Sequence, residues 1–163
     1  MGDINNDGTD DICVGYSQLV TGTAYIVWGG SDIDDVELSD ANVKIRSTQG
    51  SSRNIGSPIR GLGDVNYDGY PDIAIGESGS PPNDVYIFYG PFTGGDSTFD
   101  DIDADVRLAG DSNEDHSYSV ATFTDDVTGD DVKDLLIGSP YNDLPFDQGN
   151  SSGSVYIIPG IGL

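Results

Sequence analysis

An Asp-rich loop followed by a short apolar segment occurs three times, and this repeat sets the strongest limit on the fold of the chain. The loops begin at Asp3, Asp64 and Asp126, so they recur after 61 and 62 residues. A second motif, apolar-Tyr-Ile, recurs in step at 24–29, 85–90 and 155–160. Self-similarity at this period is typical of stacked supersecondary units. We therefore expect one similar structural unit per period.

Each apolar segment is short, rich in β-branched or aromatic residues, and bounded by Gly, Pro, Asp or Ser, which is typical of strands. No stretch has convincing helical periodicity. In the middle period the pattern predicts strands near 56–62, 72–76, 84–90 and 105–109. An element at 43–46 in the first period is aligned with 105–108 in the second. Four antiparallel strands per period are typical of a propeller blade. The predicted fold is all-β, with antiparallel four-stranded blades of β-propeller type.

The chain has room for about two and a half such blades. We expect a partial blade at 1–50 with loop 3–11, a complete blade at 51–112 with loop 64–72, and a partial blade at 113–163 with loop 126–134. The first lacks the strand before its loop, and the last lacks its outer strand. An open stack exposes apolar faces and unpaired edges. We therefore expect either a homo-oligomer or a chain that belongs to a larger propeller.

The middle loop has the oxygen ligands that calcium requires. Side-chain oxygens stand at positions 1, 3, 5 and 9, Gly69 permits the turn at position 6, and position 7 offers its backbone carbonyl. Ca²⁺ takes six to eight oxygens in flexible geometry, whereas Mg²⁺ requires a stricter octahedron. No His or Cys accompanies the loops, which argues against zinc. The predicted ligands are Asp64, Asn66, Asp68, Tyr70 and Asp72.

The other two loops match the ligand positions of the middle loop to different degrees. The first loop matches fully, with predicted ligands Asp3, Asn5, Asp7, Thr9 and Asp11. The third departs from it, with predicted ligands Asp126, Thr128, Asp130, Val132 and Asp134. Thr128 replaces Asn and Asp131 replaces Gly, so we expect the third site to be the weakest. The sequence thus predicts about three Ca²⁺ per chain. The alternative is that these runs are only polar turns.

Composition supports cation binding and excludes several partners. The formal net charge is -23, and 26 of the 29 acidic residues are Asp. Asp is typical of turns, caps and metal loops rather than of solvated helices. Such charge repels nucleic acids and anionic membranes, so we expect neither nucleic-acid binding nor membrane insertion. A surface adapted to high salt remains an alternative source of this acidity. The lone Cys13 lies in an apolar run, which favours a buried structural thiol.

The loops and strands together resemble FG-GAP repeats, as found in the β-propeller of integrin alpha subunits. The family's Phe-Gly-x-Ser opening is eroded to the segments 55–58 and 117–120, and its Gly-Ala-Pro ending to 75–78 and 137–140. The resemblance implies Ca²⁺ in the hairpin between the first two strands of each blade. It also implies an extracellular or cell-surface protein that serves adhesion or binds a protein or glycan ligand, without naming that ligand.

Catalysis is not expected from the sequence. His116 has no nucleophile motif around it, and Asp pairs such as 34–35 and 100–101 arise by chance in so acidic a chain. Trp28, Tyr89 and Tyr141 suit either sugar stacking or core packing. The leading hypothesis is a non-catalytic, calcium-binding adhesion or ligand-binding module. The alternative is a structural propeller segment of a carbohydrate-active enzyme.

Overall fold

Strands make up nearly all the regular structure of the chain. The computed structural model describes residues 1–16, 22–31, 33, 35–47, 53–79, 83–93, 97–110, 119–123, 125–140 and 153–160. The strands are β1 (Ile12–Tyr16), β2 (Thr23–Val27), β3 (Val43–Arg46), β4 (Arg53–Gly63), β5 (Asp72–Gly79), β6 (Val85–Phe88), β7 (Ser97–Asp100), β8 (Val106–Leu108), β9 (Ser119–Phe123), β10 (Leu135–Ser139) and β11 (Ser154–Ile158). Two short 3-10 turns, η1 (Leu38–Asp40) and η2 (Asp101–Asp103), are the helical elements in these ranges. Within them, no helix has the length and apolar character needed to cross a membrane.

The middle sheet confirms the predicted blade. Its strands run in the order β4-β5-β6-β8, and every neighbouring pair is antiparallel. All four predicted strands of the middle period are present, although β4 and β5 extend beyond their predicted bounds. The all-β, propeller-type fold class is therefore confirmed.

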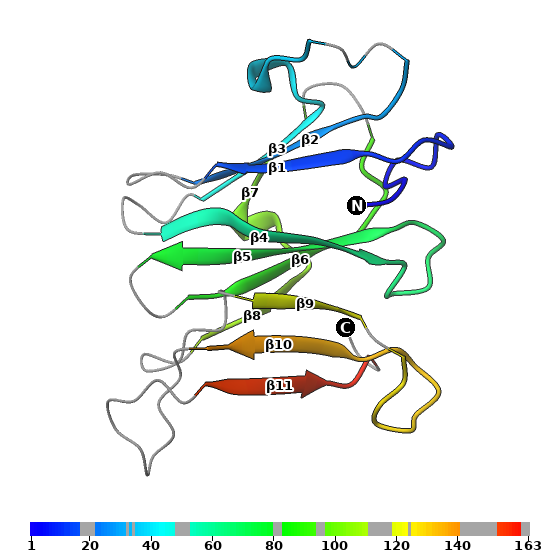
Figure 1. Ribbon diagram of the computed structural model, residues 1–163, viewed down its shortest axis with the longest axis vertical. Helices are drawn as coiled ribbons and strands as arrows, with labels where there is room; N and C mark the ends of the chain where they lie inside the picture. The colour runs from blue at the N-terminus through cyan, green and yellow to red at the C-terminus, as the bar shows by residue number, and fades with distance from the viewer. Residues whose placement is uncertain are drawn as a thin grey trace.

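The first and last sheets lie on either side of the middle sheet, so that the three are stacked along the long axis of the molecule (Figure 1). The first has the order β1-β2-β3-β7 and the last the order β11-β10-β9. In the described residues no strand precedes the loop before β1, and none follows β11. These sheets have the incomplete form that the repeat pattern predicts. The boundaries between the three blades stay predictions.

The strand β7 was not predicted. It comes from the segment between β6 and β8, crosses to the first sheet, and pairs with β3 in parallel. The expectation of purely antiparallel blades is therefore wrong at this edge. Phe99 of β7 packs edge-on against Phe88 and Phe92, with ring centroids 6.5 and 6.4 Å apart. These contacts bring β7 to the open edge of β3, whose backbone groups would otherwise lack strand partners.

The alignment of the third repeated element also needs a one-residue correction. In the first sheet Val43 lies opposite Ile26, and in the middle sheet Val106 lies opposite Ile87. Segment 43–46 therefore corresponds to 106–109 rather than 105–108. Because side chains alternate between the faces of a sheet, a slip of one residue exchanges the faces.

The middle sheet is covered on both faces, which explains its continuous apolar strands. Toward the first sheet it places a buried cluster that includes Ile73, Ile75 and Tyr86. Toward the last sheet it places Ala74 and Ile87, which pack with residues of β10 and β11. Every residue of β6 is buried. The core thus consists of two apolar layers that alternate with three sheets.

Two glycines allow the first and middle sheets to approach at backbone distance. A Cβ on Gly15 of β1 would lie 1.7 Å from the carbonyl oxygen of Gly56 in β4. Gly56 itself has a φ of +114°, a conformation that L side chains rarely adopt. No larger residue fits this contact unless the sheets separate.

We expect Gly15→Ala to lower the free energy of unfolding by about 3 kcal/mol, because the added methyl forces two backbones apart. Gly63→Ala is the control, since its φ is +71° but nothing lies within 4 Å of the added Cβ. That control should cost about 1 kcal/mol, the cost of a left-handed backbone alone. Thermal or urea unfolding measures both. Equal stability of the two variants would contradict the close contact.

Candidate metal centre

The three Asp loops lie along one edge of the stacked sheets. One precedes β1, the second joins β4 to β5, and the third joins β9 to β10, all on the right-hand side of Figure 1. The second and third loops are therefore hairpins between the first two strands of their sheets. The loops share an edge because each one leads into the equivalent strand of its sheet, namely β1, β5 or β10.

In the second loop, hydrogen bonds turn the side chains at positions 1, 3 and 5 inward. The Asp64 carboxylate accepts the backbone N–H groups of Asp68 and Gly69, at 3.1 and 2.9 Å. The Asn66 side-chain oxygen accepts the N–H of Asp68 at 3.0 Å, and its amide donates to the Asp68 carboxylate at 2.9 Å. Asp68 in turn accepts the N–H of Tyr70 at 2.8 Å. This arrangement gathers hard oxygen atoms on the inside of one turn.

The first loop repeats this pattern bond for bond. Asp3 accepts from the N–H groups of Asp7 and Gly8 at 2.9 and 2.8 Å. Asn5 and Asp7 form the same pair of contacts as Asn66 and Asp68, and Asp7 accepts the N–H of Thr9 at 2.9 Å. Two loops separated by 61 residues thus have one geometry. A shared conformation is expected where the sequence repeats the same side chains at the same positions.

The Asp at position 9 ties each of these loops to a more distant part of its sheet. One oxygen of Asp72 accepts the N–H of Val65 at 2.7 Å, and the other accepts the N–H of Gly90, beyond β6, at 2.9 Å. Asp11 makes the equivalent bonds to Ile4 and Gly29, at 2.8 and 2.9 Å. A carboxylate has about four lone-pair sites. Each of these oxygens therefore keeps a lone pair that suits a cation.

Asp72 is fully buried. Burial raises the pKa of its carboxyl group, the hydrogen bonds from Val65 and Gly90 oppose that shift, and the nearby charges of Asp68 and Asp64 add to it. A cation in the loop would offset both the burial and the repulsion between carboxylates. The electrostatics of the second loop therefore favour a bound cation.

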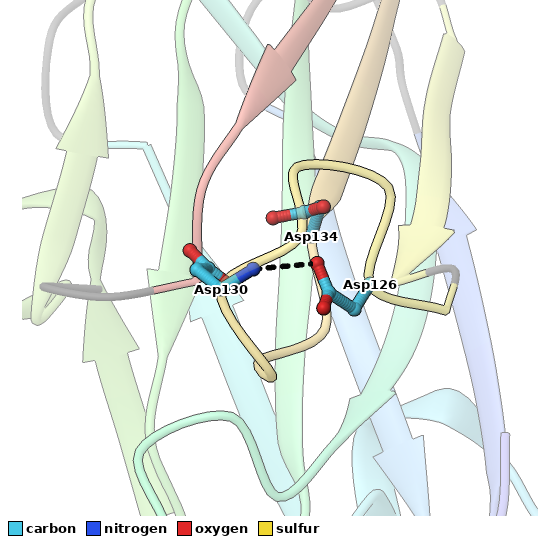
Figure 2. A group of neighbouring side chains, drawn as sticks. All are labelled: Asp126, Asp130 and Asp134. Atoms are coloured by element: carbon cyan, nitrogen blue, oxygen red, sulfur yellow. Dashed lines mark hydrogen bonds between the residues drawn. The ribbon is translucent and has the colours of Figure 1, made fainter.

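The third loop brings three predicted ligands together. One carboxylate oxygen from each of Asp126, Asp130 and Asp134 lies within 4.8 Å of the others, and Figure 2 shows the three side chains around the turn. Among the described residues, it is the only group of three Asp, Glu, His or Cys side chains whose ligand atoms all lie within this distance. In the first two loops the three carboxylates do not all come within that distance of one another.

The departures in the third loop have visible consequences. The Thr128 hydroxyl donates to Asp134 at 3.1 Å, and Asp134 also accepts the backbone N–H groups of Val127 and Thr128. Asp131 adopts a φ of +66°, so it does occupy the left-handed position that Gly8 and Gly69 occupy in the other loops. The turn survives the replacement because Asp tolerates this conformation better than most residues.

The Asp126 carboxylate is held in its charged form by the backbone. Hydrogen bonds from the N–H groups of Asp131, Gly129 and Asp130 keep the pKa of this carboxyl group below its usual range. The pattern of N–H donors around the position-1 Asp thus recurs in the third loop. An ionised carboxylate at this position is the form that a cation requires.

Adjacent loops are in direct contact. The side-chain amide of Asn6 in the first loop donates to the backbone carbonyl of Gly69 in the second, at 3.2 Å. Asn6 has a φ of +59°, and Tyr67 holds the equivalent position of the second loop at +62°. Sequence reasoning passed over position 4 because its side chain is not a ligand.

An ion pair that the sequence did not predict lies at the opposite edge of the middle sheet. Asp84, which is fully buried, lies 2.6 Å from the guanidinium of Arg107 and accepts the N–H of Gly110 at 2.9 Å. The bond to Asp84 raises the pKa of Arg107. The ion pair links the residue before β6 to β8. Asp84 and Arg107 are 23 positions apart, so no short sequence motif indicates that they meet.

Three other residues that the sequence singled out, Trp28, Tyr89 and Cys13, lie in the described part of the chain. Trp28 and Tyr89 pack against the two apolar clusters, which confirms the core interpretation for both. Burial raises the pKa of the Cys13 thiol to about 12, so this group stays protonated and poorly nucleophilic at neutral pH. His116, Tyr141 and Asp34 lie outside the described residues.

The sequence is similar to two groups of known proteins, although no family model matches it. It is 31% identical over 157 residues to phosphatidylinositol-glycan-specific phospholipase D of Homo sapiens, an alignment that covers 85% of this chain and 18% of that protein. It is 33% identical over 98 residues to integrin alpha-6 of Gallus gallus, which covers 56% of this chain and 9% of the integrin. Integrin alpha-PS2 of Drosophila melanogaster is 31% identical over 101 residues. Both groups contain FG-GAP repeats in β-propeller regions. The chain spans less than a fifth of the length of these relatives.

The hydrogen bonds of Asp72 give a prediction that does not depend on metal. In the presence of a chelator, Asp72→Ala should lower the free energy of unfolding by about 2–4 kcal/mol, because two backbone N–H groups lose their acceptor. Asp68→Ala is the control, since this exposed side chain bonds only within its own loop. Its cost without metal should stay below about 1 kcal/mol. Urea unfolding measures both, and equal costs would argue against the anchoring role of Asp72.

Proposed function

We propose that this chain is a calcium-binding extracellular module of the FG-GAP repeat family. Integrin alpha chains and phosphatidylinositol-glycan-specific phospholipases D are related to the same family. Its role is adhesion or the binding of a protein or glycan ligand, without catalysis. The observation that carries the proposal is the meeting of Asp126, Asp130 and Asp134 within 4.8 Å in a loop that occurs three times at one edge of the fold.

The ligand chemistry of the loops favours calcium. Each loop offers carboxylate oxygens and, at position 7, a backbone carbonyl from Thr9, Tyr70 or Val132. Two of the loops add an Asn side-chain oxygen. Such all-oxygen, flexible sets suit Ca²⁺ better than Mg²⁺. Three bound ions would neutralise part of the net charge of -23, which otherwise destabilises the compact chain.

The first two loops should bind more tightly than the third. The Thr128 hydroxyl is a poorer ligand than an Asn carbonyl, and its contact with Asp134 competes with coordination. The close approach of the three carboxylates in this loop supports a site there, because a cation would relieve their mutual repulsion.

Similarity to phosphatidylinositol-glycan-specific phospholipase D favours a second candidate, because that alignment covers 85% of this chain. In this candidate the chain is a structural propeller segment of an enzyme whose catalytic residues lie elsewhere. The sequence alone suggested a carbohydrate-active enzyme as the host, whereas this relative is a phospholipase. An assay of the isolated chain on phosphatidylinositol-glycan-anchored protein should show no cleavage, and cleavage would contradict both candidates.

Calorimetric titration of the chelator-treated protein with calcium should give three sites per chain. Asp68→Ala should remove one site and leave two, because its carboxylate belongs to the second loop alone. The double change Thr128→Asn and Asp131→Gly should tighten the weakest site about tenfold or more, an effect of about 1.4 kcal/mol. The matched control is Thr98→Asn, outside the loops, which should change nothing. A stoichiometry near zero would refute calcium binding.

Removing calcium should destabilise the fold. An ion at 100 times its dissociation constant adds about 2.7 kcal/mol per site, and for a chain of this size chelation should lower the melting temperature by roughly 10 °C or more. Differential scanning calorimetry with and without chelator measures the shift. Addition of about 1 M NaCl to the chelated protein is the control for general screening. Full recovery in NaCl would mean that acidity, rather than site binding, explains the effect.

A further inference from the structure

We propose that the calcium sites of the first and second loops are coupled through the side chain of Asn6, so that an ion in one loop raises the affinity of the other. Because this coupling needs ions in the loops, it rests on the proposed function. Asn6 is a positioning residue and not a ligand. It acts through the hydrogen bond that its amide donates to the backbone carbonyl of Gly69, at 3.2 Å.

Both ends of this hydrogen bond lie between predicted ligands. Asn6 stands between Asn5 and Asp7, whose side chains are themselves hydrogen-bonded at 2.8 Å. Gly69 stands between the position-5 carboxylate and the position-7 carbonyl of the second loop. An ion that fixes the ligands of either loop therefore also fixes one partner of the bond between the loops.

The side chain at position 4, and not the backbone there, distinguishes this junction. Position 4 has a left-handed backbone in all three loops, with φ of 59° at Asn6, 62° at Tyr67 and 83° at Gly129. Asn is one of the few residues besides Gly that adopt this conformation routinely. The first loop is thus the one that combines the left-handed backbone with an amide donor.

The junction between the second and third loops lacks the equivalent link. Tyr67 holds the position of Asn6, but it is 68% exposed, and its side chain forms no hydrogen bond among the described residues. Instead it lines an open pocket of about 270 Å³ with Val132 and Lys133 of the third loop. We therefore expect the third site to bind independently of the second.

The coupling follows from the cost of ordering the loops. Fixing backbone and side-chain dihedrals costs conformational entropy. An ion in the first loop holds Asn6 in place, so the second ion binds a loop whose Gly69 carbonyl is already held. For one exposed hydrogen bond we expect an effect of about threefold on affinity. By thermodynamic linkage the second ion raises the affinity of the first site by the same factor.

Calcium titration followed by heteronuclear NMR, with free calcium set by a chelator, resolves the sites. The Gly8 and Gly69 amides donate to the position-1 Asp of their loops at 2.8 and 2.9 Å, so each reports the ion in its own loop. Asp7→Ala, which disables the first loop, should weaken the second site about threefold. Asp130→Ala, which disables the third loop, is the matched control. It removes the same charge and should leave the second site unchanged.

Asn6→Gly tests the hydrogen bond itself. Glycine accepts the left-handed backbone, as Gly129 does in the third loop, but it has no amide side chain. In this variant the second site should weaken about threefold, and adding Asp7→Ala should weaken it no further. Tyr67→Gly is the control for added backbone freedom at position 4, and it should leave the third site unchanged. Far-ultraviolet circular dichroism in saturating calcium should match the wild-type chain in every variant.

Sites that bind independently in the wild-type chain would overturn the coupling and leave the proposed function intact. The coupling would also be refuted if Asp7→Ala kept its full effect in the Asn6→Gly background, since another contact would then link the loops. Equal weakening by Asp7→Ala and Asp130→Ala would assign the effect to net charge instead. Absence of calcium binding would contradict the proposed function as well, and the calorimetric stoichiometry separates that outcome from the others.

Discussion

The fold depends on one buried carboxylate per repeat, the Asp at the ninth position of each loop. In the first two repeats this side chain accepts a backbone N–H from inside its own loop and a second from beyond the next strand, as Asp72 does from Val65 and Gly90. A single residue thereby fixes the loop, the start of one strand and the end of its neighbour. In the third repeat Asp134 accepts three hydrogen bonds within the loop, from the backbone N–H groups of Val127 and Thr128 and from the Thr128 hydroxyl.

The packing of the sheets explains why the repeats lie in register. The middle sheet is buried on both sides, and the contact between Gly15 and Gly56 brings the backbones of β1 and β4 together. These contacts leave little freedom for one sheet to slide over the next. Consequently all three loops emerge at the same edge, and Asn6 of one loop reaches the carbonyl of Gly69 in the next.

The acidic loops and the exposed apolar side chains occupy different parts of this architecture. The acidic loops lie at one edge of the stack (Figure 1), whereas exposed apolar side chains such as Ile12 and Ile157 lie on the two outer sheets. A net charge of -23 opposes both compaction and self-association. Cations in the loops would reduce that charge without covering either outer sheet.

The sequence by itself determined the repeat, the strand content and the three loops. Local chemistry was sufficient, since Asp, Asn and Gly at fixed spacing dictate the turn, and Ile73 and Ile75 alternate with Ala74 in a strand buried on both sides. Only the tertiary structure decided that β7 would cross to β3, that Asp84 would pair with Arg107, and that the third loop would gather its carboxylates most closely. The first two features depend on contacts between residues that are distant in the chain. The third depends on which backbone and side-chain donors each carboxylate accepts. The order of residue types along the chain does not specify either.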